Sequence, residues 1–276
     1  MAASGNCRDP LDWRTFSSRA YFMSLVSTLL PGHVALVGGG PGDAELLTVR
    51  AARLIGQADV LVFDHLVGNA ILALARPEAE RIYVGKQAGK HTLSQEGINA
   101  LLIKLAREGK RVVRLKGGDP YIFGRGGEEG EALSAAGIVF EVVPGVTAAC
   151  GAAAYTGIPL THRDHAQAVI FVTGHLRDDS SNLDWPALAR AQQTVVIYMG
   201  VLSLPEISRQ LIAHGMPPET PAACVRHATL PEQLTVAATI ATLPQAVADA
   251  GLRPPALLII GHVVRLREQL NWFEKP

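Results

Sequence analysis

The chain has 276 residues, of which 48 % are hydrophobic and 18 % charged, and 25 Lys and Arg residues balance 25 Asp and Glu residues. This length supports one large domain or two smaller ones, and a net charge of zero argues against non-specific nucleic-acid binding, which needs excess cations. No apolar run approaches the roughly 20 residues that span a bilayer. The odd number and wide spacing of the cysteines (Cys7, Cys150 and Cys224) argue against a disulfide framework and favour a reducing cytoplasm.

Residues 1–32 show no strong periodicity. They contain Arg, Ser and aromatic residues, but Asp9 and Asp12 weaken a transit-peptide interpretation and no clear apolar core precedes a cleavage site. We expect a mobile N-terminal extension here, and a short tail at residues 271–276.

Residues 33–144 alternate short apolar runs with helical stretches. Ser94 is a plausible N-cap for one of the helices. Because strands that alternate with helices pair in parallel, this half predicts an α/β sandwich. Strands are expected at 33–38, 59–64, 81–86, 111–116 and 138–143, and helices at 44–58, 68–75, 94–108 and 128–136.

The second half, residues 145–270, begins with a segment rich in small residues, 144–165, which predicts a linker and a tightly packed helix. Longer connections follow, and they favour a sheet of mixed direction. Strands are expected at 168–174, 194–200, 222–228 and 256–264, with a helix at 203–214 and a further stretch near 233–240.

The loop "GGGPGD" at 38–43 resembles a dinucleotide-binding fingerprint but departs from it. The third glycine of that motif would fall on Asp43, and Pro41 removes a backbone donor. The next acidic residue at a strand end, Asp64, lies 26 positions after Gly38, where the fingerprint wants about 20. A nicotinamide-dependent dehydrogenase is therefore a disfavoured alternative, and an ordinary tight turn is another.

A second glycine-rich loop, "LKGGDPYIFGRGGEE" at 115–129, follows an apolar strand, where open α/β sheets bind ligands. Asp119 would repel a phosphate but suits a ribose hydroxyl, an amino group or a cation. Gly117 and Gly118 let the backbone approach a ligand closely. A small ligand with a positive centre and an adenosine fits, and S-adenosylmethionine has both.

Several long motifs then occur in order: "VGGGPGDAELLT", "VLVFDHLV", "YVGK", "LKGGDPYIFGRGGEE", "VVPGVTAACGAAAYTGIPLTHRDHA" and "FVTGH". Together they resemble the tetrapyrrole methylase family, and within it the uroporphyrinogen-III C-methyltransferases, over roughly residues 33–270. The resemblance implies two α/β domains (33–144 and 145–270) with the active site in the cleft between them, and a homodimer.

The implied reaction is the S-adenosylmethionine-dependent methylation of uroporphyrinogen III at C2 and C7. It gives precorrin-2, on the way to siroheme, haem d1 and cobalamin, and two S-adenosylhomocysteine. A siroheme synthase would need a further dehydrogenase–ferrochelatase domain, which we do not expect within this chain because only 32 residues precede the methylase body. A precorrin C-methyltransferase acting on a later intermediate and a noncatalytic S-adenosyl-binding sensor are also compatible with these motifs.

The resemblance also implies site residues, matched motif by motif. The implied cofactor contacts are Pro41, Gly117, Gly118, Asp119, Ile122, Thr147, Ala148, Met199, Ala228 and Ala256. The implied substrate contacts are His65, Arg125, Glu128, His162, Arg163 and Met199. The implied catalytic residues are Asp64, Lys86, Arg125 and Glu128.

The catalytic roles can be divided by chemistry. Arg125 and Glu128 stand three apart at a helix start and should share one face. A guanidinium is a poor base, so Arg125 is expected to clamp a substrate carboxylate. We hypothesise that Asp64 accepts the proton that the macrocycle loses, with Lys86 as its charged partner; Glu128 is the other candidate base.

At some positions the residue differs from the one that is common in the family's motifs. Gly39 and Ala44 replace a common Ala and Pro, His65 follows Asp64 where Arg is common, and "HAT" at 227–229 stands where a Gly-Thr pair is often found. The paired histidines of "HRDH" lack an obvious third ligand, and we expect no metal site.

Overall fold

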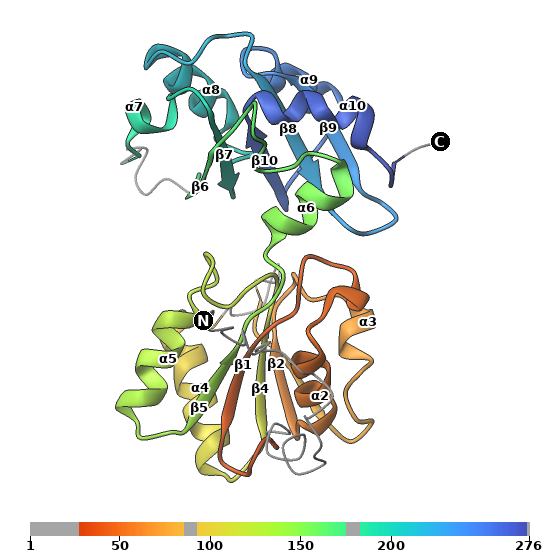
Figure 1. Ribbon diagram of the computed structural model, residues 1–276. Helices are drawn as coiled ribbons and strands as arrows, with labels where there is room; N and C mark the ends of the chain where they lie inside the picture. Colours follow the sequence, from red (N-terminus) through yellow and green to blue (C-terminus); the bar gives the residue numbers. More distant parts are fainter. Residues whose placement is uncertain (1–27, 86–92, 175–182, 275–276) are drawn as a thin grey trace, which may run out of the picture.

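The computed structural model describes residues 28–85, 93–174 and 183–274, which form two α/β units joined by the extended segment ahead of helix α6 (Figure 1). Each unit is built on its own five-stranded sheet. The last strand of the first sheet ends at Val143 and α6 begins at Ala148. The predicted boundary between residues 144 and 145 stays a prediction, and residues 1–27, 86–92, 175–182 and 275–276 lie outside the described part.

The first unit carries a wholly parallel sheet in the order β3-β2-β4-β1-β5, as the alternation of strands and helices predicts. Its strands are β1 (Val34–Gly38), β2 (Val60–Phe63), β3 (Glu80–Tyr83), β4 (Val112–Lys116) and β5 (Phe140–Val143). Its helices are the 3-10 turn η2 (Ala44–Leu46), α2 (Val49–Gln57), α3 (Asn69–Leu72), α4 (Gln95–Arg107) and α5 (Gly126–Ala135).

Both faces of this sheet are buried, as parallel sheets require. Ala35 and Val37 of β1 belong to a core cluster with α2, while Val34 and Leu36 belong to one with α4. The chain ahead of β1 joins the first cluster through Leu29, which is 2 % exposed.

The second unit has a mixed sheet in the order β6-β7-β10-β8-β9, which confirms the sequence-based expectation. Only β6 and β7 pair in parallel. Its strands are β6 (Ala168–Thr173), β7 (Gln193–Tyr198), β8 (Pro221–Arg226), β9 (Leu234–Thr239) and β10 (Ala256–Ile260). Its helices are α6 (Ala148–Thr156), α7 (Trp185–Leu188), α8 (Leu204–Ala213), α9 (Leu243–Asp249), the 3-10 turn η3 (His262–Leu266) and α10 (Arg267–Leu270).

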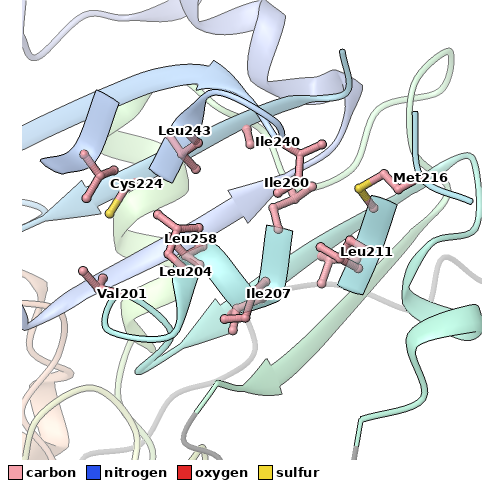
Figure 2. Packing of buried hydrophobic residues seen from close by; sticks show 14 of the residues in the cluster. Val201, Leu204, Ile207, Leu211, Met216, Cys224, Ile240, Leu243, Leu258 and Ile260 are labelled. Carbon is pink, nitrogen blue, oxygen red and sulfur yellow. The ribbon is translucent and has the colours of Figure 1, made fainter. Parts of the chain in front are cut away.

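One face of the second sheet is covered by α7, α8 and α9. Figure 2 shows the α8 side chains Leu204 and Ile207 beside Leu258 and Ile260 of β10, within one core cluster. The opposite face packs against α6, whose Ala149 and Ala152 are fully buried.

Two expected elements differ in the structure. The helix predicted at 44–58 is divided, because the Thr48 side chain accepts a hydrogen bond from Ala51 N and starts a new helix there. The strand predicted at 256–264 ends at Ile260, since Gly261 turns the chain with a φ of 143°.

The carboxyl ends of β1, β4 and β5 meet through three glycines. A Cβ atom added to Gly38 would lie 2.5 Å from the Gly145 nitrogen, and one added to Gly145 would overlap the Gly118 carbonyl oxygen. Glycine is needed here for close backbone approach, and this contact brings the loops after three strands to one place.

We predict that Gly145→Ala lowers the free energy of unfolding by about 3 kcal/mol, because the added methyl meets backbone that cannot move aside. Gly127→Ala is the matched control, since nothing lies within 4 Å of its added Cβ. It should raise that free energy by at most about 1 kcal/mol. Urea unfolding followed by circular dichroism makes the comparison, and equal midpoints for the two variants would contradict the packing argument.

Candidate active site

The two glycine-rich loops are hydrogen-bonded to each other. Gly118 N donates to the Gly40 carbonyl oxygen at 2.7 Å, and Gly40 N donates to the Gly118 carbonyl oxygen at 3.1 Å. The Gly118 backbone, a predicted cofactor contact, is therefore already paired. The space beside Gly117 is also filled, because a Cβ added there would lie 2.6 Å from the Leu66 Cβ.

Asp119 has a structural role that the sequence interpretation missed. Its Oδ1 accepts from Tyr121 N at 2.8 Å, and its Oδ2 accepts from Gly145 N at 3.0 Å. The first bond is an Asx turn, which Asp before Pro could have signalled. Each carboxylate oxygen keeps further acceptor capacity, so a ligand contact through Asp119 stays a prediction.

The first glycine-rich loop is docked on the second unit. Asp43 N donates to Thr229 Oγ1 at 3.0 Å, and the Tyr155 hydroxyl donates to Asp43 Oδ2 at 3.2 Å. Pro41, another predicted cofactor contact, packs so closely on α6 that a Cβ on Gly151 would overlap its ring. The loop thus fixes how the two units meet.

Predicted cofactor contacts of the second unit gather at the sheet edge that faces the first unit. The Tyr198 hydroxyl, at the end of β7, lies 2.7 Å from Thr147 Oγ1 and accepts from Ala149 N at 3.2 Å. Burial raises the pKa of Tyr198. Met199 follows it with a half-exposed side chain. Ala148 and Ala228 share a core cluster with Tyr198, and Ala256 is adjacent to Leu257, which pairs with Tyr198.

The two units also meet through an aromatic contact. The ring centroids of Phe123 and Tyr198 lie 4.8 Å apart, which joins the second glycine-rich loop to β7. Next to this contact Tyr121, Ile122, Phe123 and Met199 each expose more than a third of their surface. Exposed apolar side chains so close together are typical of a surface that binds another molecule.

Backbone strain is concentrated in the same loops. Five of the six non-glycine residues with positive φ in the described part of the chain lie there: Phe123, Arg125, Met199, His227 and Thr229, with φ from 49° to 73°. Such conformations cost about 1–3 kcal/mol each and cluster at functional sites. His227 and Thr229 flank Ala228 in the "HAT" departure, so the left-handed backbone persists there without glycine.

Arg125 and Glu128 share one face and form an ion pair, as their spacing predicts. Arg125 Nε and Nη2 donate to the two Glu128 oxygens at 2.8 and 2.6 Å. The pair raises the pKa of Arg125 and lowers that of Glu128. Both side chains are about half exposed, and they line a concave surface of about 560 Å³ with Tyr121 and Phe123.

Asp64 lies just past the carboxyl end of β2. Its Oδ1 accepts from Leu66 N at 3.0 Å, and its Oδ2 accepts from Arg114 Nη2 at 3.3 Å. The side chain is 22 % exposed, and the neighbouring His65 is exposed. Lys86, its predicted charged partner, lies outside the described residues.

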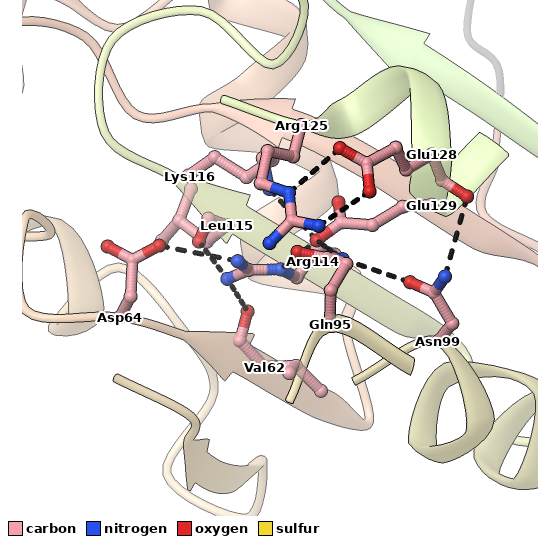
Figure 3. A network of polar contacts seen from close by, with 10 residues as sticks. All are labelled: Val62, Asp64, Gln95, Asn99, Arg114, Leu115, Lys116, Arg125, Glu128 and Glu129. Atoms are coloured by element: carbon pink, nitrogen blue, oxygen red, sulfur yellow. Dashed lines mark hydrogen bonds and ion pairs between the residues drawn. The ribbon is translucent and has the colours of Figure 1, made fainter. Parts of the chain in front are cut away.

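A buried charge cluster beneath Asp64 was not predicted. Arg114 and Lys116 of β4 and Glu129 of α5 have side chains that are at most 4 % exposed, and they form two ion pairs (Figure 3). Burial and the nearby Arg114 charge lower the pKa of Lys116. Arg114 and Lys116 on either side of Leu115 were the available signal, since the period of two in a strand puts both cations on one face of the sheet.

His162 and Arg163 are not brought to these loops. A bridge joins His162 to Ala166, and the next residue, Gln167, donates to the Gln192 carbonyl oxygen ahead of β7. Tyr198 is at the other end of β7. The loop therefore lies at the sheet end opposite the candidate site, where the tilted rings of His162 and His165 have centroids 4.8 Å apart.

Within residues 28–85, 93–174 and 183–274, no three His, Cys, Asp or Glu side chains are grouped as metal ligands would be. The helices in those same ranges include none that is both long and apolar enough to cross a bilayer.

Comparison with known proteins supplies independent information. A family model described as Tetrapyrrole (Corrin/Porphyrin) Methylases matches residues 33–244. The chain is 62 % identical over 242 residues to a siroheme synthase of Methylobacillus flagellatus. That match covers 88 % of this chain but 52 % of the relative, so the chain spans about half the length of the siroheme synthase it matches.

Solved structures agree with the fold. A uroporphyrin-III C-methyl transferase from Thermus thermophilus, complexed with S-adenyl homocysteine, is 42 % identical with a TM-score of 0.72, over 85 % of this chain and 94 % of that one. A cobalt precorrin-4 methyltransferase is 31 % identical with a TM-score of 0.76, over 84 % of this chain and 96 % of that one. The two α/β domains predicted from the sequence are thereby confirmed.

We predict that Thr229→Val lowers the free energy of unfolding by about 1–3 kcal/mol, because the isosteric change leaves the Asp43 amide without its acceptor. Thr229→Ser keeps the hydroxyl and removes the β-branch at a positive φ, so it should lose much less. Urea midpoints and hydrogen exchange at the Asp43 amide measure both effects. Unchanged exchange at Asp43 in the valine variant would contradict this role.

Proposed function

The chain belongs to the tetrapyrrole (corrin/porphyrin) methylases, and we propose that it transfers methyl groups from S-adenosylmethionine to C2 and C7 of uroporphyrinogen III. The products are precorrin-2, which feeds siroheme, haem d1 or cobalamin synthesis, and two S-adenosylhomocysteine. The names of the relatives support this reaction. The observation that carries it is the Arg125–Glu128 pair on a strained loop beside exposed Tyr121, Ile122 and Phe123.

This surface suits a flat macrocycle with a carboxylate rim. The apolar side chains can lie against its ring system. Arg125 has five N–H donors and gives two to Glu128, so further donors stay free for a substrate carboxylate. We assign Arg125 the anchoring role, with Glu128 fixing the direction of its guanidinium. His65 is an exposed additional donor, and Lys86, His162 and Arg163 stay predictions.

The residues at the edges of the two sheets fit S-adenosylmethionine. Asp119 offers spare acceptor capacity to a cation or a ribose, and Thr147, Ala148, Met199, Ala228 and Ala256 line the facing edge. Arg226 pairs with Ala256 across β8 and β10, and its Nε is buried without a hydrogen-bond partner among the described residues. This unpaired donor is an additional candidate to bind the carboxylate of the methionine part. When bound, the cofactor supplies an electrophilic methyl group on sulfur.

The protein's contribution is positioning and proton removal. Holding two reactants in line supplies much of the rate acceleration of such a transfer. Each methylation leaves a proton on the macrocycle, and the Asp64 carboxylate, partly exposed at the end of β2, is the proposed acceptor. We also propose that the protein works in the cytoplasm, because its cysteine spacing favours a reducing compartment. The family resemblance further implies that it forms a homodimer.

One alternative has a specific observation behind it. The cobalt precorrin-4 methyltransferase has a TM-score of 0.76, so a different tetrapyrrole could be the methyl acceptor. Identity is higher to the uroporphyrin-III enzyme, at 42 % against 31 %. We therefore rank uroporphyrinogen III first.

Mass analysis after incubation with uroporphyrinogen III and S-adenosylmethionine should detect addition of two methyl groups.

Asp64→Asn should lower kcat by about 100-fold or more, the usual contribution of a general base. Absence of any methylated product with the unmodified protein would refute the reaction, and full turnover by Asp64→Asn would refute the base.

Variants of Asp119 should affect mainly cofactor binding, and variants of Arg125 should affect mainly tetrapyrrole binding. Asp119→Ala is expected to weaken S-adenosylhomocysteine binding at least tenfold in calorimetry, since it removes both the charge and the loop bonds. Asp119→Asn removes the charge but keeps one acceptor oxygen, so it retains one of the two loop hydrogen bonds. Arg125→Ala should chiefly raise the KM for the tetrapyrrole, and the reverse pattern would overturn the assignment.

A further inference from the structure

Glu129 is completely buried and is the centre of the charge cluster. Its Oε1 accepts from Arg114 Nε at 3.0 Å and from Lys116 Nζ at 2.9 Å, with Gln95 Nε2 at 3.4 Å (Figure 3). Its Oε2 is buried with no hydrogen-bond partner in the described part of the chain. The carboxylate is therefore held at one oxygen by two cations.

Arg114 extends from this carboxylate to Asp64. Its Nη1 donates to the Leu115 carbonyl oxygen at 3.0 Å and to that of Val62 at 3.4 Å, and its Nη2 donates to Asp64 Oδ2 at 3.3 Å. The guanidinium is planar and its side chain is 4 % exposed. Its orientation is thus fixed by Glu129 at one end and by backbone carbonyls in the middle, which leaves the other end aimed at Asp64.

Stability alone is a weak reason for this arrangement. Burying ions costs several kcal/mol each, and apolar side chains of similar volume often serve a core equally well. Val112, the preceding β4 residue on the same face of the sheet, is indeed apolar core. The cluster instead lies directly behind the one carboxylate proposed to react.

We propose that Glu129 and Arg114 are positioning residues for the Asp64 carboxylate, an inference that rests on the proposed function. Glu129 fixes the guanidinium, the guanidinium holds Asp64 Oδ2, and Leu66 N holds Oδ1. The carboxylate keeps further acceptor capacity, and its side chain is 22 % exposed. Lys116 gives Glu129 a second cation and keeps it in place.

The same geometry sets the route of the proton. A guanidinium does not deprotonate in proteins, so Arg114 cannot pass a proton inward. The proton that leaves the macrocycle goes to Asp64 and then to solvent on its exposed side, while the electron pair of the broken bond stays in the ring. Arg114 and Glu129 keep their protonation states throughout.

The test compares Glu129→Gln and Arg114→Lys with Arg111→Lys. Glutamine keeps the shape and one acceptor but removes the charge that fixes Arg114, while lysine cannot reach Glu129 and Asp64 together. Arg111 is a matched control. It forms an ion pair with Asp59 at 2.7 Å at the amino ends of β4 and β2, whereas Arg114 and Asp64 meet nearer the carboxyl ends of these strands. Circular dichroism, S-adenosylhomocysteine affinity and methylation kinetics are measured for each.

Both cluster variants should lower kcat at least tenfold while the KM for the tetrapyrrole and the affinity for S-adenosylhomocysteine change less than threefold. Arg111→Lys should keep its kcat. Unchanged kcat in Glu129→Gln, or failure of both cluster variants to fold, would overturn the positioning role. If the unmodified protein methylates no tetrapyrrole, the proposed function itself fails, which is a distinct outcome.

Discussion

The contact of backbone on backbone at Gly38, Gly118 and Gly145 is the constraint on which the candidate site depends. It draws together the chain after three neighbouring strands, so the loops must leave the sheet in the same direction. Asp119 can then reach Gly145 N, and the first loop can reach Thr229 and Tyr155 on the second unit. The meeting of the two units is a consequence of close packing at one sheet edge.

The two ends of the second glycine-rich loop have different roles, one structural and one available for ligand binding. The Asp119 end is turned inward and closes hydrogen bonds to backbone amides. The Arg125 end is turned outward, carries a positive φ, and presents an exposed ion pair. The loop therefore has one acidic group that mainly holds backbone amides and one ion pair that is available to a ligand.

The spacing of apolar runs and the lengths of their connections were enough to predict the alternating strands, the mixed direction of the second sheet and the position of the glycine-rich loops. They failed where the decisive partner is distant in sequence. In the sequence Glu129 has the position of an exposed carboxylate in the first turn of a helix. In the structure it is buried and forms ion pairs with Arg114 and Lys116 of β4. Short elements such as α7 and η3 were also missed.

The strand order of the first sheet has a consequence for synthesis. β4 lies between β1 and β2, so these two early strands share no direct pairing. During synthesis a domain generally folds as a unit, after its chain has left the ribosome. Here β1 has no sheet neighbour until residues 112–116 have emerged, and β5 completes the layer only later. The nascent first unit must therefore remain open until these late strands are made, with its apolar strands available to chaperones.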